Sequence, residues 1–252
     1  MHSDFDEDIQ DHSEDFEAAE EAMLAVVLAA TLGTISGAEA QGQLELIAGE
    51  LKRRSGAWAA EVLPEVYLDG LQEALGPQDA TQRLADPLHQ AFVRNASEGL
   101  VEALAGTTDQ MSRDAKLALR EIAREQIAAM MEGGINAIPQ AAEMTERLEE
   151  RGVRFVDRSG RRWKTRGYSE MVLKDAATDL SNDANLNAAD ELGSPGVRVF
   201  DGGPGDTDEP CLRANGQVWS RSYARGHTRE HNNCRRAFAP LPSTFDGRLD
   251  RE

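Results

Sequence analysis

Residues 197–241 read VRVFDGGPGDTDEPCLRANGQVWSRSYARGHTREHNNCRRAFAPL, and this stretch decides how the C-terminal part of the chain is organised. It contains both cysteines of the protein, Cys211 and Cys234, and two of its five histidines, His227 and His231. Thiolate and imidazole groups are the ligands that zinc prefers in proteins. The C-x15-H-x3-H-x2-C spacing therefore makes these four residues the candidate ligands of one structural Zn²⁺.

Other interpretations of the same four residues stay open. Only His231 and Cys234 are close in sequence, and the Cys-x-x-Cys pair of many structural zinc sites is missing. The same residues would also be consistent with buried side chains that bind no metal, with a disulfide, or with a metal-dependent hydrolase that uses Asp208 or Glu230 as general base. A structural metal would stabilise a loop-rich segment that, on this reading, has no apolar core of its own.

The part of the chain that precedes this stretch has the pattern of packed helices. Aromatic residues make up only 5% of the sequence, so a core must come mostly from Ala, Leu, Val and Ile. Ser112 is placed as an N-cap, Pro87 suits a first helical turn, and Gly133 marks a helix end. Apolar periodicity and these signals predict helices over 14–32, 38–54, 57–75, 81–106 (one or two), 112–131 and 138–151.

The pattern changes at Gly152. Alternating residues on both sides of a turn at 158–160 predict a β-hairpin, followed by a helix over 168–192 and short strands at 196–200 and 217–220. The fold class is therefore α+β and mainly α, with an N-terminal helical body and a small C-terminal β-hairpin, helix and loop module. The predicted divisions are an acidic disordered tail (1–21), a helical domain (22–151), the module (152–241) and a second tail (242–252).

Charge is spread unevenly along the chain. The net charge is −18, and residues 1–21 hold ten acidic and no basic side chains, so bulk binding to nucleic acid is disfavoured. That acidic segment reads as a solvated tail, or alternatively as a docking peptide anchored by Phe5, Ile9 and Phe16. The longest apolar run, residues 22–32, is eleven residues, which is too short to span a bilayer, so no membrane partner is expected.

Basic side chains recur after Gly152, among the aromatic residues Trp163, Tyr168, Trp219 and Tyr223. Arginine beside aromatic rings can hold phosphate groups and stack bases. The alternative is that these charges pair with the acidic helical half. The candidates for nucleic-acid contact are Arg158, Arg161, Arg162, Lys164, Arg166, Arg235 and Arg236.

Several short motifs follow one another in the C-terminal part. They are Tyr168-Ser-Glu-Met171, Val197–Phe200, Asp208-Glu-Pro-Cys211, Asn215-Gly-Gln-Val-Trp219 and Glu230-His-Asn-Asn-Cys234, with Pro240 after them. In this order they resemble tailed-phage minor capsid proteins of the Mu F-type head-morphogenesis group, especially the branch called phage minor capsid protein 2. The chain departs from that family at two positions. Asn232 replaces the proline of His-Pro-Asn-Cys, and Ala214 stands where the second cysteine of Cys-x-x-Cys is usual.

The resemblance spans Gly152–Leu241 and implies a non-enzymatic structural protein of the virion. It implies a place inside the phage head, near the portal and the packaged DNA, with portal and capsid proteins as partners and the host cytoplasm as the site of assembly. Cys211, His231 and Cys234 are the metal-ligand candidates that the family pattern supports, whereas His227 comes from spacing alone. The alternative functions are a metal-dependent hydrolase using the Cys/His cluster and a host-side adaptor binding through the acidic tail.

Overall fold

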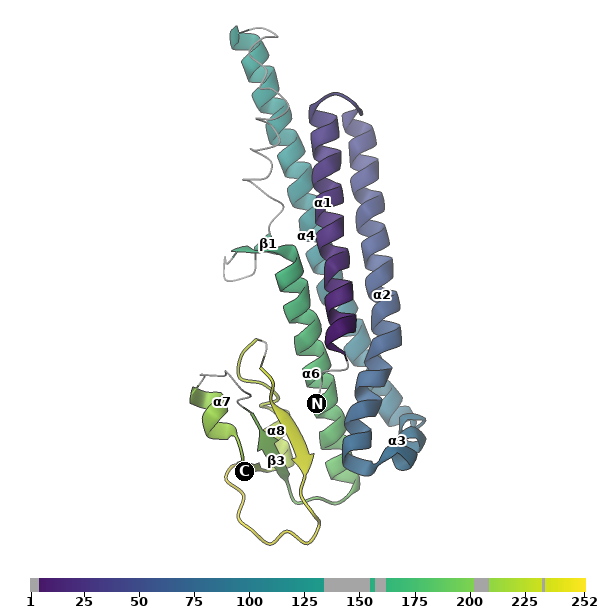
Figure 1. The fold of residues 1–252 in the computed structure, drawn as a ribbon, viewed down its shortest axis with the longest axis vertical. Coiled ribbons are helices and arrows are strands. Elements are labelled where there is room, and N and C mark those ends of the chain that lie inside the picture. The colour runs from purple at the N-terminus through teal and green to yellow at the C-terminus, as the bar shows by residue number, and fades with distance from the viewer. Residues whose placement is uncertain (1–4, 134–154, 157–161, 202–208, 233) are drawn as a thin grey trace. The chain divides into compact units, whose positions relative to one another are not determined.

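The structure, a computed structural model, describes residues 5–133, 155–156, 162–201, 209–232 and 234–252. It is mainly helical with a small antiparallel sheet, which confirms the expected α+β class (Figure 1). The helices are α1 (Asp6–Thr31), α2 (Gly37–Leu75), α3 (Pro77–Leu84), α4 (Pro87–Gly133), α6 (Thr165–Glu191), α7 (Glu209–Ala214) and α8 (Arg221–Arg225). The strands are β1 (Phe155–Val156), β2 (Arg162–Trp163), β3 (Val197–Phe200), β4 (Val218–Trp219) and β5 (Ala237–Pro240).

The chain forms two compact units, and each is assembled from separated segments. The helical unit comprises residues 10–56 and 101–170, and the sheet unit comprises residues 1–9, 57–100 and 171–252. The long helices α2 and α4 therefore contribute residues to both units. In this division the C-terminal strands share a unit with the C-terminal half of α2 and the start of α4.

The helical unit buries an apolar stripe of α1 together with one of α2, and Figure 1 shows α1, α2 and α4 side by side. Phe16, Met23 and Val27 of α1 are fully buried, as are Leu44 and Leu51 of α2. These positions recur with the period of a helix, so each helix presents one apolar face. Leu104 and Met111 of α4 are buried as well, so all three helices contribute to the core of the unit.

The expected disordered tail over residues 1–21 is wrong for the part that the structure describes. Residues 6–21 are helical, and Ile9 and Phe16 are buried within the protein rather than available to anchor a partner. The acidic side chains occupy the exposed positions between them. Ile9, Phe16 and Met23 repeat every seven residues and mark one helix face, a pattern that the many acidic residues make hard to recognise in the sequence.

Two helices are longer than the sequence predicts. Helix α2 continues through Ser55 and Gly56, where a break was expected, and the Ser55 hydroxyl donates to the carbonyl of Leu51 at 3.0 Å. Helix α4 begins at Pro87 and ends at Gly133 as expected, but it passes through Ser112. Ser112 is buried inside the helix, so its assignment as an N-cap is wrong.

The sheet unit contains a three-stranded antiparallel sheet in the order β4-β3-β5. Helix α6 precedes it and ends at Glu191, and Gly193, two residues later, has a left-handed φ of 61° that favours glycine. The helix predicted over 168–192 and the strands predicted at 196–200 and 217–220 are thus confirmed. Strand β5 was not predicted.

The expected lack of an apolar core around the C-terminal stretch is wrong. Val197 and Val199 alternate inward on β3 and pack with Leu186 of α6, Trp219 of β4 and Phe238 of β5. All of these side chains are buried, so hydrophobic burial stabilises this part of the fold before any metal is considered.

The expected C-terminal tail also contacts the sheet unit. The amide of Asp250 donates to the carbonyl of Val218 at 2.7 Å, and the amide of Ser220 donates to the carbonyl of Arg251 at 2.8 Å. The last residues therefore lie along β4, and a side chain on Gly196 would collide with the nearby carbonyl of Trp219.

The predicted β-hairpin is confirmed at the four residues described, because β1 and β2 pair antiparallel. The predicted helix over 138–151 and the hairpin turn at 158–160 lie outside the described residues. In the part of the chain with described coordinates, we find no helix with the length and apolar character needed to cross a bilayer.

Candidate metal centre

Three metal-ligating side chains converge in the sheet unit. Cys211 lies on α7, whereas His231 and Cys234 lie in the loop that precedes β5. The Cys211 sulfur is 3.2 Å from Nε2 of His231 and 3.8 Å from the Cys234 sulfur. All three ligand atoms lie within 4.8 Å of one another, so the group can hold a metal ion. Both thiols are free rather than joined in a disulfide.

A backbone contact orients the imidazole of His231 for this role. Its Nδ1 lies 2.8 Å from the carbonyl oxygen of Asn232, and a carbonyl can only accept, so Nδ1 carries the proton. The other ring nitrogen, Nε2, then presents its lone pair toward the sulfur of Cys211. Metal-binding histidines in proteins are commonly fixed by a hydrogen bond from the second nitrogen in this way.

A buried ion pair adjoins the two thiols. Nε of Arg236 lies 2.7 Å from Oδ2 of Asp201, and the two side chains are 1% and 0% exposed. The same guanidinium donates to the carbonyl of His227 at 2.8 Å, and Oδ1 of Asp201 lies 3.8 Å from the sulfur of Cys234. One carboxylate therefore links the ion pair to the cysteine cluster.

Burial raises the pKa of the Cys211 thiol, and the neighbouring Cys234 and Asp201 raise this pKa further. The thiol is consequently protonated at neutral pH when no cation is present. A metal ion binds the thiolate, so its binding would release protons and would weaken as the pH falls.

His227 does not belong to this group, and its expected role as a fourth ligand is corrected. Its ring stacks on Tyr223, with ring centroids 4.0 Å apart and planes inclined by 11°. Its Nδ1 donates to the backbone carbonyl of Tyr223 at 2.8 Å, one helical turn earlier. The sequence spacing predicted that His227 binds the metal, but the backbone places its imidazole against the ring of Tyr223. Asp208 lies outside the described residues.

Four of the seven candidates for nucleic-acid contact have described side chains. Arg236 is buried in its ion pair with Asp201, so its assignment as a nucleic-acid contact is wrong. Arg166 is half-buried and forms ion pairs with Glu14 and Glu17. Two candidates, Lys164 and Arg235, are exposed. Arg158 and Arg161 lie outside the described residues, as does the side chain of Arg162.

Other arginines of the sheet unit pair with aspartates of α6. Arg221 lies 2.6 Å from Asp190, and Arg229 lies 2.6 Å from Asp175. These contacts support, for these residues, the interpretation that basic side chains neutralise acidic helices. They also attach the segment between β4 and β5 to α6.

Asp201 was missed, although its position was readable from the strand. Val197 and Val199 alternate inward on β3, and the next inward position is Asp201. The pairing of Phe200 with Ala237, continued by one residue, sets Asp201 opposite Arg236. The alternation could have identified the carboxylate, but the identity of its partner required the unpredicted strand β5.

Two thiols and an oriented imidazole, all held by the backbone of one unit, form a ligand set suited to a soft or borderline divalent cation. A comparison of the chain with protein-family models, curated proteins and solved structures found no match.

Proposed function

We propose that the chain is a non-enzymatic structural protein of a tailed-phage head, placed near the portal and the packaged DNA. One observation carries the proposal. The motifs that resemble phage minor capsid proteins are scattered over the C-terminal sequence, yet Cys211, His231 and Cys234 gather beside the β4-β3-β5 sheet. Motifs that share one folded body are expected if the resemblance reflects a common fold.

We further propose that the centre holds one structural Zn²⁺. Zinc–sulfur bonds of about 2.3 Å in a tetrahedral site place two sulfurs about 3.8 Å apart. The sulfurs of Cys211 and Cys234 are 3.8 Å apart, which matches this separation without rearrangement. Asp201, whose Oδ1 lies 3.8 Å from the Cys234 sulfur, adjoins the centre but is not one of the three residues whose ligand atoms converge.

A stabilising role for the metal fits the surroundings better than a catalytic one. Catalytic zinc keeps one position open for water or substrate, whereas structural zinc is enclosed by protein ligands. Cys211 and Cys234 are both buried, and Asp201 beside them is held by Arg236. These features favour the structural role over the hydrolase alternative.

The distribution of charge agrees with a place between protein and DNA. Acidic side chains occupy the exposed positions of α1, which suits a basic surface of a portal or capsid partner. Lys164 and Arg235 are exposed basic side chains on the C-terminal part, which suits weak contact with phosphate groups. The host-side adaptor would use the same acidic helix.

Particles produced from the genome that encodes the chain provide the test. Heads are purified, treated with DNase, and analysed by quantitative mass spectrometry alongside procapsids. We expect a few copies of the chain per particle in heads or procapsids, retained after DNase. A Cys234→Ser chain is expected to be incorporated less well, because its C-terminal fold is weakened. Absence of the wild-type chain from both heads and procapsids would overturn the proposal.

A further inference from the structure

The sheet unit has a pocket that Cys211, His231 and Cys234 do not line. It is a half-open pocket of about 340 Å³, bordered by α7, β4, α8 and the C-terminal residues. Its size matches a small organic ligand rather than a single ion. The inference drawn from it goes beyond the proposed function and does not depend on it.

Three aromatic rings form one wall of this pocket. Trp219 meets Tyr223 edge-on at 5.1 Å between ring centroids, and His227 stacks on Tyr223 at 4.0 Å. Tyr223 and His227 are partly exposed, whereas Trp219 behind them is buried. The backbone contact of His227 fixes its ring, so the wall is already ordered before a ligand arrives. Such a surface suits a planar ring.

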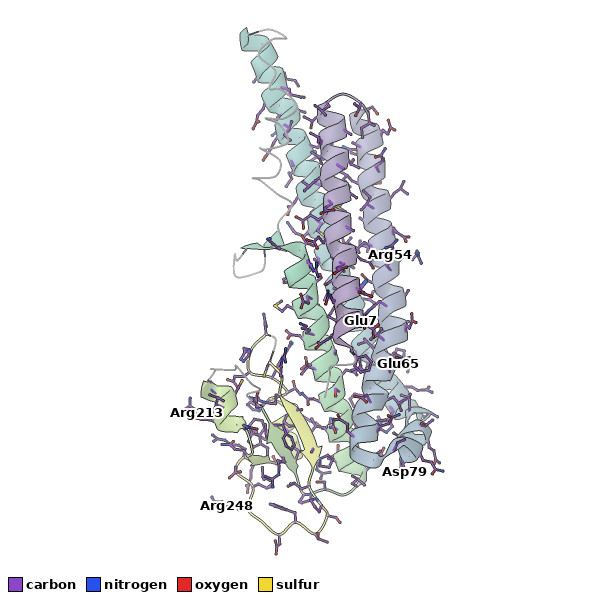
Figure 2. The ribbon with its side chains drawn as sticks, in the orientation of Figure 1. Glu7, Arg54, Glu65, Asp79, Arg213 and Arg248 are labelled. Carbon is purple, nitrogen blue, oxygen red and sulfur yellow. The ribbon has the colours of Figure 1, made fainter. Side chains whose placement is uncertain are left out.

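Charged side chains on the rim favour an anion. Arg213 and Arg251 border the pocket and are exposed, and Figure 2 shows Arg213 on α7. The third arginine, Arg236, pairs with Asp201, and Glu230, the acidic residue that borders the pocket, lies 3.7 Å from the same guanidinium. The Arg251 guanidinium therefore adds a positive charge to a rim whose carboxylate already has a partner.

Specific polar groups complete the wall. The Trp219 indole donates to Oε1 of Gln217 at 2.7 Å, which turns the amide so that its nitrogen remains a donor. Because Nδ1 of His227 is engaged with the backbone, its Nε2 can accept a hydrogen bond or, when protonated, donate one. The pocket thus offers donors and acceptors beside a flat surface, as base recognition requires.

We propose that this pocket binds a nucleotide unit, with its base against the Tyr223–His227 wall and its phosphate on Arg251. An apolar ligand would leave Arg251 without a role in binding, and an inorganic anion would leave the aromatic wall without one. A nucleotide uses both. The unit can come from a free nucleotide or from a single strand of nucleic acid, because both present a base next to a phosphate.

Isothermal titration calorimetry of the full chain at low salt tests the proposal by measuring the affinity for four probes. They are inorganic phosphate, thymidine, thymidine monophosphate and a short single-stranded oligothymidylate. We expect the monophosphate to bind about tenfold or more tightly than either phosphate or thymidine, since stacking and charge contribute together. An oligothymidylate that binds more tightly than the monophosphate identifies a strand as the source, and equal affinity identifies the free nucleotide.

Matched variants locate the binding. Arg251→Gln is expected to weaken binding of the monophosphate about tenfold, because one charge-assisted contact is lost. Arg248→Gln removes the same charge from an exposed position in the same segment that does not line the pocket, and it is expected to leave binding unchanged (Figure 2). Circular dichroism melts check that both variants fold. Equal affinity for phosphate and monophosphate, no binding of any probe, or equal losses in the two variants would overturn the proposal.

Discussion

Replacement of Arg236 by methionine removes the positive charge that faces Asp201 inside the sheet unit. The two side chains are 1% and 0% exposed, so water cannot solvate the carboxylate that is left behind. The substitution also removes the hydrogen bond to the His227 carbonyl and the guanidinium that lies 5.0 Å from the Trp219 ring centroid. Loss of one partner of a buried ion pair costs about 3–5 kcal/mol. We expect the free energy of unfolding of the sheet unit to fall by that amount.

Urea denaturation with a chelator present measures this cost without a contribution from metal. A chain with Trp58 and Trp163 replaced by phenylalanine reports from Trp219 alone, which lies in the sheet unit. With a slope of about 2 kcal/mol per molar urea, the midpoint is expected to fall by about 2 M. Arg235→Met is the matched control, since this neighbour is exposed and its substitution should change stability by less than about 0.5 kcal/mol. Similar midpoints for the two variants would refute the buried-pair reasoning.

Three further outcomes are expected. Burial lowers the pKa of His12 from 6.5, so the imidazole is protonated more readily in the unfolded chain than in the folded one, and stability is lost as the pH falls below about 6.5. The urea midpoint should therefore fall less steeply between pH 8 and pH 5 in His12→Gln than in the wild type, and parallel profiles would exclude the effect. Gly70→Ala should destabilise the protein by about 1–3 kcal/mol, because the added Cβ would lie 2.8 Å from Cβ of Ala184, whereas Gly49→Ala, whose added Cβ meets no atom within 4 Å, should stabilise α2 by about 0.5–1 kcal/mol. Thermal melts compare the two variants, and melting temperatures that shift in the same direction would contradict this packing. Tyr67→Phe should lower the free energy of unfolding by about 1–3 kcal/mol, because the Tyr67 hydroxyl hydrogen-bonds to buried Asn187 at 2.7 Å and to buried His89 at 2.8 Å. An unchanged melting temperature would argue against that network.

The fold was predictable from the sequence wherever one periodic signal dominated. Strand β3 was expected within one residue because its side chains alternate between buried and exposed positions, and the end of helix α6 was expected at Leu192, next to Gly193. Strand β5 was not, since Ala237–Pro240 contains proline and small residues and becomes a strand only by pairing with β3. Local turn signals also misled at Ser112, where continuous packing of α4 outweighs the capping preference.

The sequence predicted which types of residue form the candidate site, but not every individual residue that belongs to it. Cys211, His231 and Cys234 were expected together, and the structure gathers them. His227 was assigned by spacing, yet spacing does not state which way a side chain points, and its ring lies on Tyr223 instead. Asp201 adjoins the cluster through a tertiary contact with no local signature beyond strand alternation.

The most direct test of the account is the metal content of the purified full chain. Inductively coupled plasma mass spectrometry is applied after exhaustive dialysis against metal-free buffer, with Cys234→Ser and His227→Gln measured alongside. The account predicts about one zinc per wild-type chain, the same amount in His227→Gln, and a large loss in Cys234→Ser, since only the last removes a ligand. Wild-type protein supplied with zinc that retains none, or equal zinc in wild type and Cys234→Ser, would contradict it.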